Sequence, residues 1–166
     1  MSAMENLIVH ANNSLLARAA LQNRTEARAG EVENGALHLV RLVESFVFQL
    51  NQQTRSTLAI LSTEPRTIDM TSDIGILPIN AYDLTLTVGA KTLQIQLNDF
   101  SYGQEVIANV IGTSRHYELH LADSWGAYRE RSDSPAGQLE LEGPAPLDQA
   151  TLVEIATALF QDTTWR

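Results

Sequence analysis

The stretch from Tyr82 to Asn98 constrains the fold of this 166-residue chain more than any other segment. Apolar and polar residues alternate on both sides of Gly89-Ala90, and a two-residue loop with glycine first is typical of a type II′ hairpin turn. In the register that this loop imposes, one face of the hairpin is apolar and the other is polar. The apolar face holds the pairs Leu86–Leu93, Leu84–Ile95 and Tyr82–Leu97, and the polar face holds Thr87–Thr92, Thr85–Gln94 and Asp83–Gln96. A slip of one residue would expose the apolar set, so the sequence predicts this hairpin in a single register.

A second strand pair is predicted over residues 105–111 and 116–121, joined by the loop 112–115. Symmetric closure of that loop gives an apolar face with the pairs Val110–Tyr117, Ala108–Leu119 and Val106–Leu121. The opposite face is mixed and holds Ile107, Asn109, Ile111, His116, Glu118 and His120. Because two isoleucines lie on this outer face, we expect a helix, a loop or a second subunit to cover part of it.

The N-terminal 62 residues are predicted to be helical. A first helix is expected from Met4 to Ala29, ending at Gly30, on apolar residues at near-helical spacing: Leu7, Ile8, Ala11, Leu15, Ala19 and Ala20. A second helix is expected after a break at Asn34-Gly35, on the seam formed by Leu39, Val43, Phe46 and Leu50. Ala29 and Val32 fit the same heptad frame, so one long kinked helix is the alternative.

The heptad seam has two interpretations, a coiled-coil dimer or a face that packs on the sheet. Fewer than three clean heptads follow the break, which favours packing on the sheet. Residues 57–62 fit either the end of the helix or an edge strand, and residues 63–81 are predicted to be an irregular connection containing Pro65 and Pro78.

The C-terminal part is predicted to finish the sheet and close it with a helix. Trp125–Arg131 indicates a short exposed strand, and Gln138–Glu142 indicates a last strand with Leu139 and Leu141 inward, ended by the segment 143–146. The closing helix, residues 147–162, has Asp148 as its N-cap and an apolar stripe of Leu152, Ile155, Ala156, Leu159 and Phe160.

These elements predict an α+β fold: an antiparallel β-meander of about five strands, with two N-terminal helices or one long kinked helix, and a C-terminal helix packed on it. A single domain is expected over residues 1–166, divided into a helical segment (1–62), an irregular connection (63–81), an antiparallel sheet (82–142) and a closing helix (147–162).

Charge narrows the classes of partner. The formal net charge is −9, and residues 63–166 carry all of the excess, with six basic against fifteen acidic side chains. This potential would repel phosphate backbones and anionic lipids, so neither nucleic acid nor membrane is expected as a partner. The chain has no cysteine, no membrane-length apolar run and no basic leader, which together favour a cytoplasmic protein.

The residues offer one metal-binding pattern. His116, Glu118 and His120 alternate on a predicted strand, so two imidazoles and a carboxylate would share one face. These three side chains could together coordinate a divalent metal ion. A polar outer face on an amphipathic strand is the simpler interpretation and the one favoured here. Nucleophile motifs and phosphate-binding glycine loops are absent from the sequence, and no cofactor is expected.

Aromatic residues in connecting segments form the other candidate site. Phe100, Tyr102, Trp125 and Tyr128 are either anchors of a binding surface or plugs at the end of the sheet, and Ile107 and Ile111 add to the same candidate surface. The sequence therefore predicts a small acidic, non-enzymatic protein-interaction domain, such as an adaptor, chaperone or inhibitor, with a protein partner and a possible homodimer. The alternatives are a small-molecule-binding domain with an apolar pocket between sheet and helix, and a metal-dependent enzyme using the His-x-Glu-x-His strand.

Overall fold

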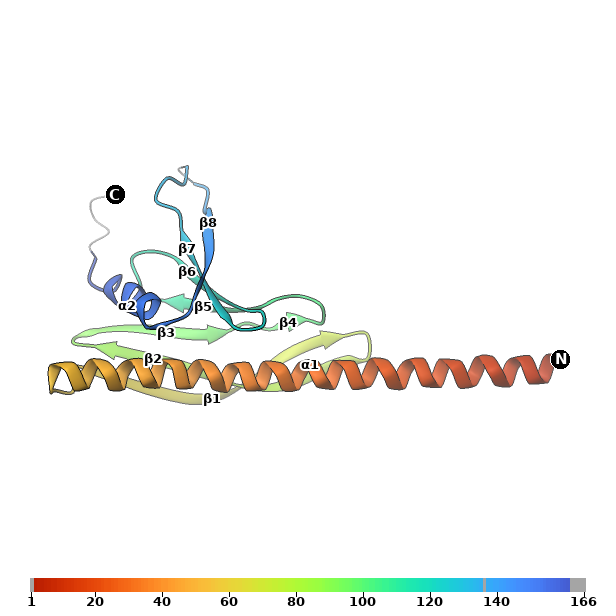
Figure 1. Cartoon of the computed structure of the whole chain (residues 1–166). Helices are drawn as coiled ribbons and strands as arrows, with labels where there is room; N and C mark the ends of the chain where they lie inside the picture. The colour runs from red at the N-terminus through yellow and green to blue at the C-terminus, as the bar shows by residue number, and fades with distance from the viewer. Residues whose placement is uncertain (1, 136, 162–166) are drawn as a thin grey trace.

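The chain folds as an α+β protein with a long N-terminal helix, an eight-stranded, mostly antiparallel sheet and a short C-terminal helix (Figure 1). The computed structural model describes residues 2–135 and 137–161. The elements are α1 (Ala3–Thr54), β1 (Ala59–Ser72), β2 (Gly75–Val88), β3 (Lys91–Leu97), β4 (Phe100–Ser101), β5 (Val106–Ile111), β6 (Tyr117–Leu121), β7 (Trp125–Glu130), β8 (Leu141–Pro146) and α2 (Gln149–Thr157). The strand order is β4-β1-β2-β3-β5-β6-β7-β8, and among the described residues only the short β1–β4 contact is parallel. The sheet has eight strands, so the prediction of about five strands was too low.

The N-terminal region is one helix of 52 residues, so of the two predicted possibilities the single long helix is the one that forms. It begins with a capping box in which the Ser2 side chain accepts from the Glu5 backbone N–H and the Glu5 carboxylate accepts from the Ser2 N–H. The predicted end at Gly30 and break at Asn34-Gly35 are wrong, because Gly35 serves close packing instead. A Cβ atom at this position would lie 2.4 Å from Leu121 Cδ2, and the Gly35 carbonyl accepts a 2.8 Å hydrogen bond from the Trp125 indole N–H.

The two predicted strand pairs are present in the predicted registers. β2 and β3 pair Leu84 with Ile95 and Leu86 with Leu93, and Gly89 has φ +61°, the left-handed value that the first residue of a type II′ turn requires. The pairs Val110–Tyr117, Ala108–Leu119 and Val106–Leu121 join β5 to β6, and all six side chains are buried.

Residues 63–81 are not irregular. They belong to β1 and β2, two 14-residue strands that pair along their whole length, so residues 57–62 contain the start of a strand at Ala59. β1 lies near the edge of the sheet, and β3 pairs with β2 only from Leu84 onward, so neither Pro65 nor Pro78 interrupts a ladder between two central strands. The predicted sheet segment, residues 82–142, therefore began too late.

The end of the chain corrects three further predictions. β7 is not an exposed strand, because it pairs with β6 and β8 and buries Trp125 and Ala127. The last strand is Leu141–Pro146 instead of Gln138–Glu142; Leu139 is exposed, and the proline-rich segment forms an edge strand, a place that proline tolerates. α2 ends at Thr157, short of the predicted residue 162, which lies outside the described residues, and Asp148 caps it by accepting from the Thr151 N–H at 2.9 Å.

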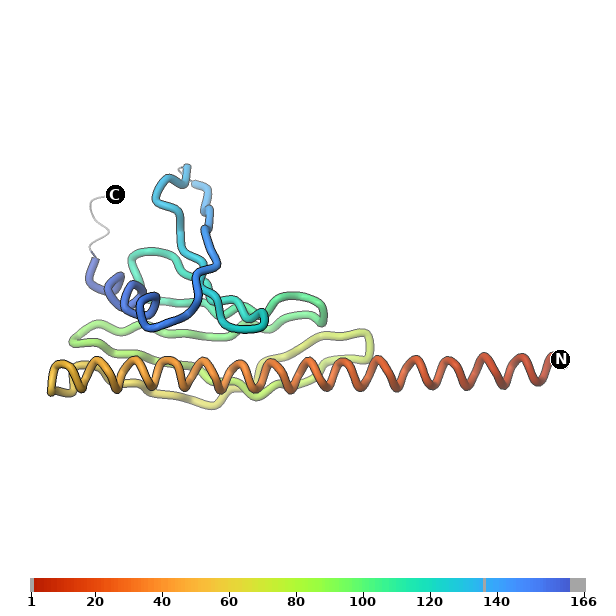
Figure 2. The backbone as a smooth tube through the Cα atoms, in the orientation of Figure 1, coloured from red at the N-terminus to blue at the C-terminus, as the bar shows by residue number. Residues whose placement is uncertain are grey.

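One face of the sheet forms the core with both helices. Val32, Leu39 and Val43 of α1 and Leu152 and Ile155 of α2 are buried together with the inward side chains of the strands. Figure 2 shows that the first part of α1 continues past the end of the sheet, and residues 2–20 are exposed throughout. The fold thus consists of a packed body and a projecting helix.

Candidate functional site

The projecting part of α1, residues 3–24, is called the arm. Thr25 is the first buried residue of the helix, and before it only Leu21 is as much as half-buried. The arm nevertheless carries large apolar side chains, among them Leu15 with 67% and Leu16 with 69% of their surface exposed. Large exposed apolar side chains that gather on one element mark interaction surfaces in soluble proteins.

Four apolar residues of the arm continue the seam that packs on the sheet, whereas Leu7, Val9 and Leu16 lie outside this frame. Between Thr25 and Phe46 the buried seam follows alternating steps of four and three, through Thr25, Ala29, Val32, Ala36, Leu39, Val43 and Phe46. The same frame extended backwards reaches Leu15, Ala11, Ile8 and Met4, with Gln22 and Arg18 between. This spacing is the one by which helices pack along a partner.

A groove lies where the arm meets the body. It is lined by Ala17, Arg18 and Leu21 of α1 and by Asp73 and Ile74 at the tip of the β1–β2 hairpin. Ile76, the next apolar residue on β2, has 66% of its surface exposed. The base of the arm is therefore a partly apolar recess flanked by one cationic and one anionic side chain.

A cluster of titratable side chains occupies the outer face of β5–β7. His120 lies between two carboxylates, with Nδ1 2.9 Å from Glu105 Oε2 and Nε2 3.1 Å from Glu118 Oε2. His116 Nε2 lies 3.2 Å from the other Glu118 oxygen, and the Tyr128 ring stacks at a tilt on His120 with centroids 4.3 Å apart. His116, Glu118 and His120 therefore lie on one face, as strand alternation predicts, because both imidazoles contact the Glu118 carboxylate.

Burial and hydrogen bonding act in opposite directions on the pKa of Glu118, and hydrogen bonding has the larger effect. Burial on its own would raise the pKa of this carboxyl, but hydrogen bonds from His120 and His116 hold the pKa below its ordinary value of 4.5. The ring nitrogens and carboxylate oxygens satisfy one another, and within residues 2–135 and 137–161 no group of three or more such side chains has an arrangement that could hold a metal ion. The arrangement suits an ion-pair network on a sheet surface.

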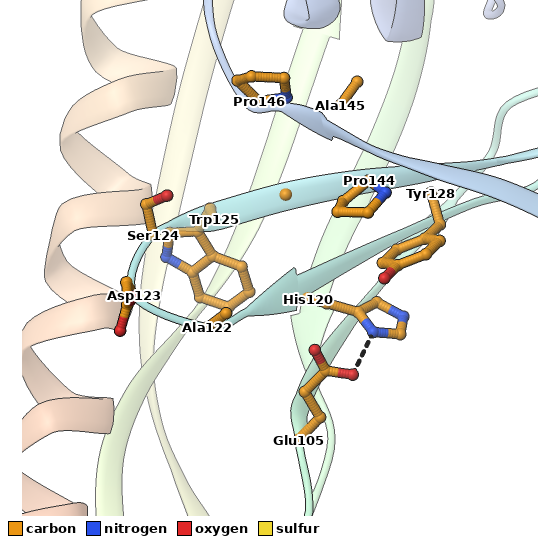
Figure 3. Close-up of a pocket in the computed structure, with 11 residues that line it drawn as sticks. Glu105, His120, Ala122, Asp123, Ser124, Trp125, Tyr128, Pro144, Ala145 and Pro146 are labelled. Carbon is orange, nitrogen blue, oxygen red and sulfur yellow. Dashed lines mark hydrogen bonds and ion pairs between the residues drawn. The ribbon is translucent and has the colours of Figure 1, made fainter.

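A recess beside this cluster runs under the edge strand (Figure 3). It is lined by Glu105, His120, Tyr128, Trp125, Pro144 and Pro146, and in the close-up the His120 ring points towards Glu105. Both ring nitrogens of His120 are already paired with carboxylates, so the recess offers a ligand the remaining lone pairs of the Glu105 carboxylate and the apolar surfaces of its proline and aromatic residues.

The aromatic candidates divide between core and surface. Phe100 and Trp125 are buried in the core, which favours the second of their two interpretations, plugs of the sheet, over surface anchors. Tyr102 has 39% of its surface exposed beside Arg24 and Arg28 of α1, and Tyr128 is half-buried in the outer-face cluster. On the same outer face Ile107 is half-buried and Ile111 has 48% of its surface exposed.

Sequence reasoning missed the arm as a site because it used the apolar spacing of residues 4–20 only to predict a first helix that ends at Gly30. The available signal was length. A single helix of 52 residues is about 78 Å long, whereas a compact body of this chain length is about 40 Å across, so part of such a helix has to project.

None of the helices in the described residues is long and apolar enough to cross a membrane. Comparison of the chain with protein-family models, with curated proteins and with solved structures gave no match.

Proposed function

We propose that this chain is a non-enzymatic protein-interaction module whose docking element is the arm. The single observation that carries the proposal is the exposed apolar stripe of residues 3–24 in the same heptad frame as the buried seam. The body holds one end of the helix, and the other end is left for a partner.

Burial of the apolar side chains of the arm by a partner would be energetically favourable. Burying Met4, Leu7, Ile8 and Leu15 would contribute roughly 6–12 kcal/mol before ordering costs, at about 1.5–3 kcal/mol for each side chain. Most helical stability in proteins comes from packing of an apolar face, and residues 2–20 are exposed throughout. A bound partner would therefore stabilise both the apolar surface and the helix.

Charge favours a protein as the partner. The arm carries one acidic and two basic side chains, Glu5, Arg18 and Arg24, whereas the acidic excess lies in residues 63–166. The arm thus lacks the run of cations that binds phosphate groups, and an apolar helix face suits the groove or the helix of another protein.

The arm is a stronger basis for function than an interior pocket. The space between α1 and the sheet is filled by packed side chains such as Val32, Leu39 and Val43, so the small-molecule alternative rests on surface recesses, among them the recess beside His120. Nothing about that recess selects a ligand class, so the arm carries the proposal.

Site-directed photocrosslinking in the native cell tests it. A benzophenone amino acid is placed at Ile8, in the apolar stripe, or at Asn13, on the opposite side of the helix. Five residues at 100° each put Asn13 about 140° from Ile8 around the helix axis. We expect a defined polypeptide adduct from position 8 and a much weaker adduct from position 13. Equal labelling at both positions, or no adduct from position 8, would contradict the proposal.

A further inference from the structure

The geometry points to a second copy of this chain as the occupant of the arm, in an antiparallel pair in which each arm tip lies in the groove at the base of the other arm. This inference rests on the proposed function and specifies its partner. Three features of the described residues support it: the continuity of the seam, the position of the groove and the distribution of charge.

The seam supplies a self-complementary surface. Met4, Ile8, Ala11 and Leu15 extend the packing frame of the helix–sheet interface beyond the sheet, so the arm is an apolar ridge without its own layer to pack on. A two-fold axis brings the same ridge of a second chain against it, and each arm then covers the other. The stretch from Asn6 to Ala17 contains no Asp, Glu, Lys or Arg, so the middle of this overlap buries no charge apart from any on His10, and Glu5 and Arg18 lie towards its ends.

The groove lies where the tip of an antiparallel arm arrives. Met4 and Leu21 are 17 residues apart, or about 26 Å along the helix. In an antiparallel pair centred between residues 12 and 13, Met4 of one chain lies level with Leu21 of the other, beside Ala17 and Ile74. The exposed Ile74 and Ile76 of the hairpin tip would then contact the apolar tip of the second arm.

Charge selects the antiparallel orientation over the parallel one. The acidic residue of the arm, Glu5, is at its tip, and the basic residues, Arg18 and Arg24, are towards its base. Antiparallel pairing brings each tip carboxylate level with the stretch between the two arginines, whereas parallel pairing aligns like charges.

The acidic bodies favour the same orientation. Antiparallel arms place the two bodies at opposite ends, with their Thr25 residues about 38 Å apart along the pair, well beyond the screening length of about 8 Å at physiological salt. Parallel arms would set two bodies with the same acidic excess side by side. Both charge terms therefore act in the same direction.

Disulfide trapping in the full chain tests the geometry, and the absence of native cysteine makes single-cysteine variants unambiguous. Met4→Cys and Gln22→Cys proteins are mixed and oxidised, because Gln22 is the seam residue next to Leu21, whereas Leu21 itself lies about 100° around the helix from the seam. We expect the mixed 4–22 disulfide to exceed the Met4→Cys self-disulfide by about tenfold, because a disulfide requires Cβ atoms within about 4.5 Å. Asn13→Cys, on the far side of the helix, is the control that should remain largely uncrosslinked.

Sedimentation of the uncrosslinked proteins supplies the second measurement. The wild-type chain should dimerise with increasing concentration, and Ile8→Asp should weaken the dimer at least tenfold, since a carboxylate would enter the apolar overlap. Asn13→Asp adds the same charge on the opposite face and should leave the dimer unchanged. Thermal melting shows that both variants keep the body folded.

The outcomes separate this inference from the proposed function. A dominant Met4→Cys self-disulfide, or a wild-type chain that stays monomeric at the highest concentration tested, overturns the antiparallel dimer. If the monomeric chain still yields a heterologous adduct from position 8 in the crosslinking experiment, the interaction function stands and its partner is a different protein. If position 8 yields no adduct at all, both fail.

Discussion

The two halves of α1 have the same heptad frame and opposite environments. Leu39 in the second half is 1% exposed beneath the sheet, whereas Leu15 in the first half is 67% exposed. The same frame of apolar residues runs through both, interrupted in the first half by Arg18 and Gln22, so periodicity indicates that a face is to be buried and does not indicate what buries it. In this chain the sheet covers one half, and the other half, which is exposed, is the part that we propose a partner covers.

The strongest test of this comparison replaces the same residue type in each half. Leu39→Ala should lower the free energy of unfolding by about 2–5 kcal/mol, because it leaves a cavity in a close-packed core. Leu15→Ala should change the stability of the monomer by less than about 0.5 kcal/mol, since its side chain contacts solvent. Urea unfolding of both variants at a concentration where the protein is monomeric gives the two values. Equal losses in the two variants would show that the arm packs on the body after all.

Alanine substitutions at the two glycines of α1 test how closely the sheet packs against the helix at each position. Gly35→Ala should destabilise the protein by about 1 kcal/mol, because the new Cβ would lie 2.4 Å from Leu121 Cδ2 and the overpacking cost exceeds the gain in helix propensity. Gly30→Ala should stabilise by about 0.5–1 kcal/mol, because no atom lies within 4 Å of its Cβ position. Thermal melts of the two variants should shift in opposite directions, and a shift of both in the stabilising direction would mean that Leu121 moves aside freely.

Local signals predicted the parts of the fold in which turn chemistry and alternation agree. Gly89-Ala90 set the register of β2–β3, and the alternation from Val106 to Leu121 set that of β5–β6. The errors arose where one residue type serves two purposes. Gly35 resembles a helix end but permits close approach to Leu121, and the prolines of 143–146 resemble a break but form an edge strand.

The candidate site was predictable only in part, for a related reason. Strand alternation placed His116, Glu118 and His120 on one face, as the contacts of both imidazoles with the Glu118 carboxylate confirm. Glu105 and Tyr128 joined them through pairings between segments that sequence spacing does not encode. The burial of Phe100 and Trp125 and the exposure of the arm depend on where the sheet ends relative to the helix, which is a property of the assembled fold.

The smallest expected effect extends the comparison from packing to charge. The arm has no carboxylate between Asn6 and Arg24, whereas Glu118 in the body accepts hydrogen bonds from two histidines. Because the folded-state pKa of Glu118 is lowered from 4.5, its ionised form contributes stability above that value, and the contribution is lost as pH falls through the lower folded-state pKa. Glu118→Gln should therefore cost up to about 1 kcal/mol at pH 7, a figure reduced for partial solvent screening, and the difference from wild type should shrink in acid. Unfolding free energies of both proteins between pH 7 and pH 3 measure it. A difference that grows as the pH falls below 4.5 would mean that the histidines stabilise the protonated carboxyl, and the body would then lack the pH sensitivity that separates it from the arm.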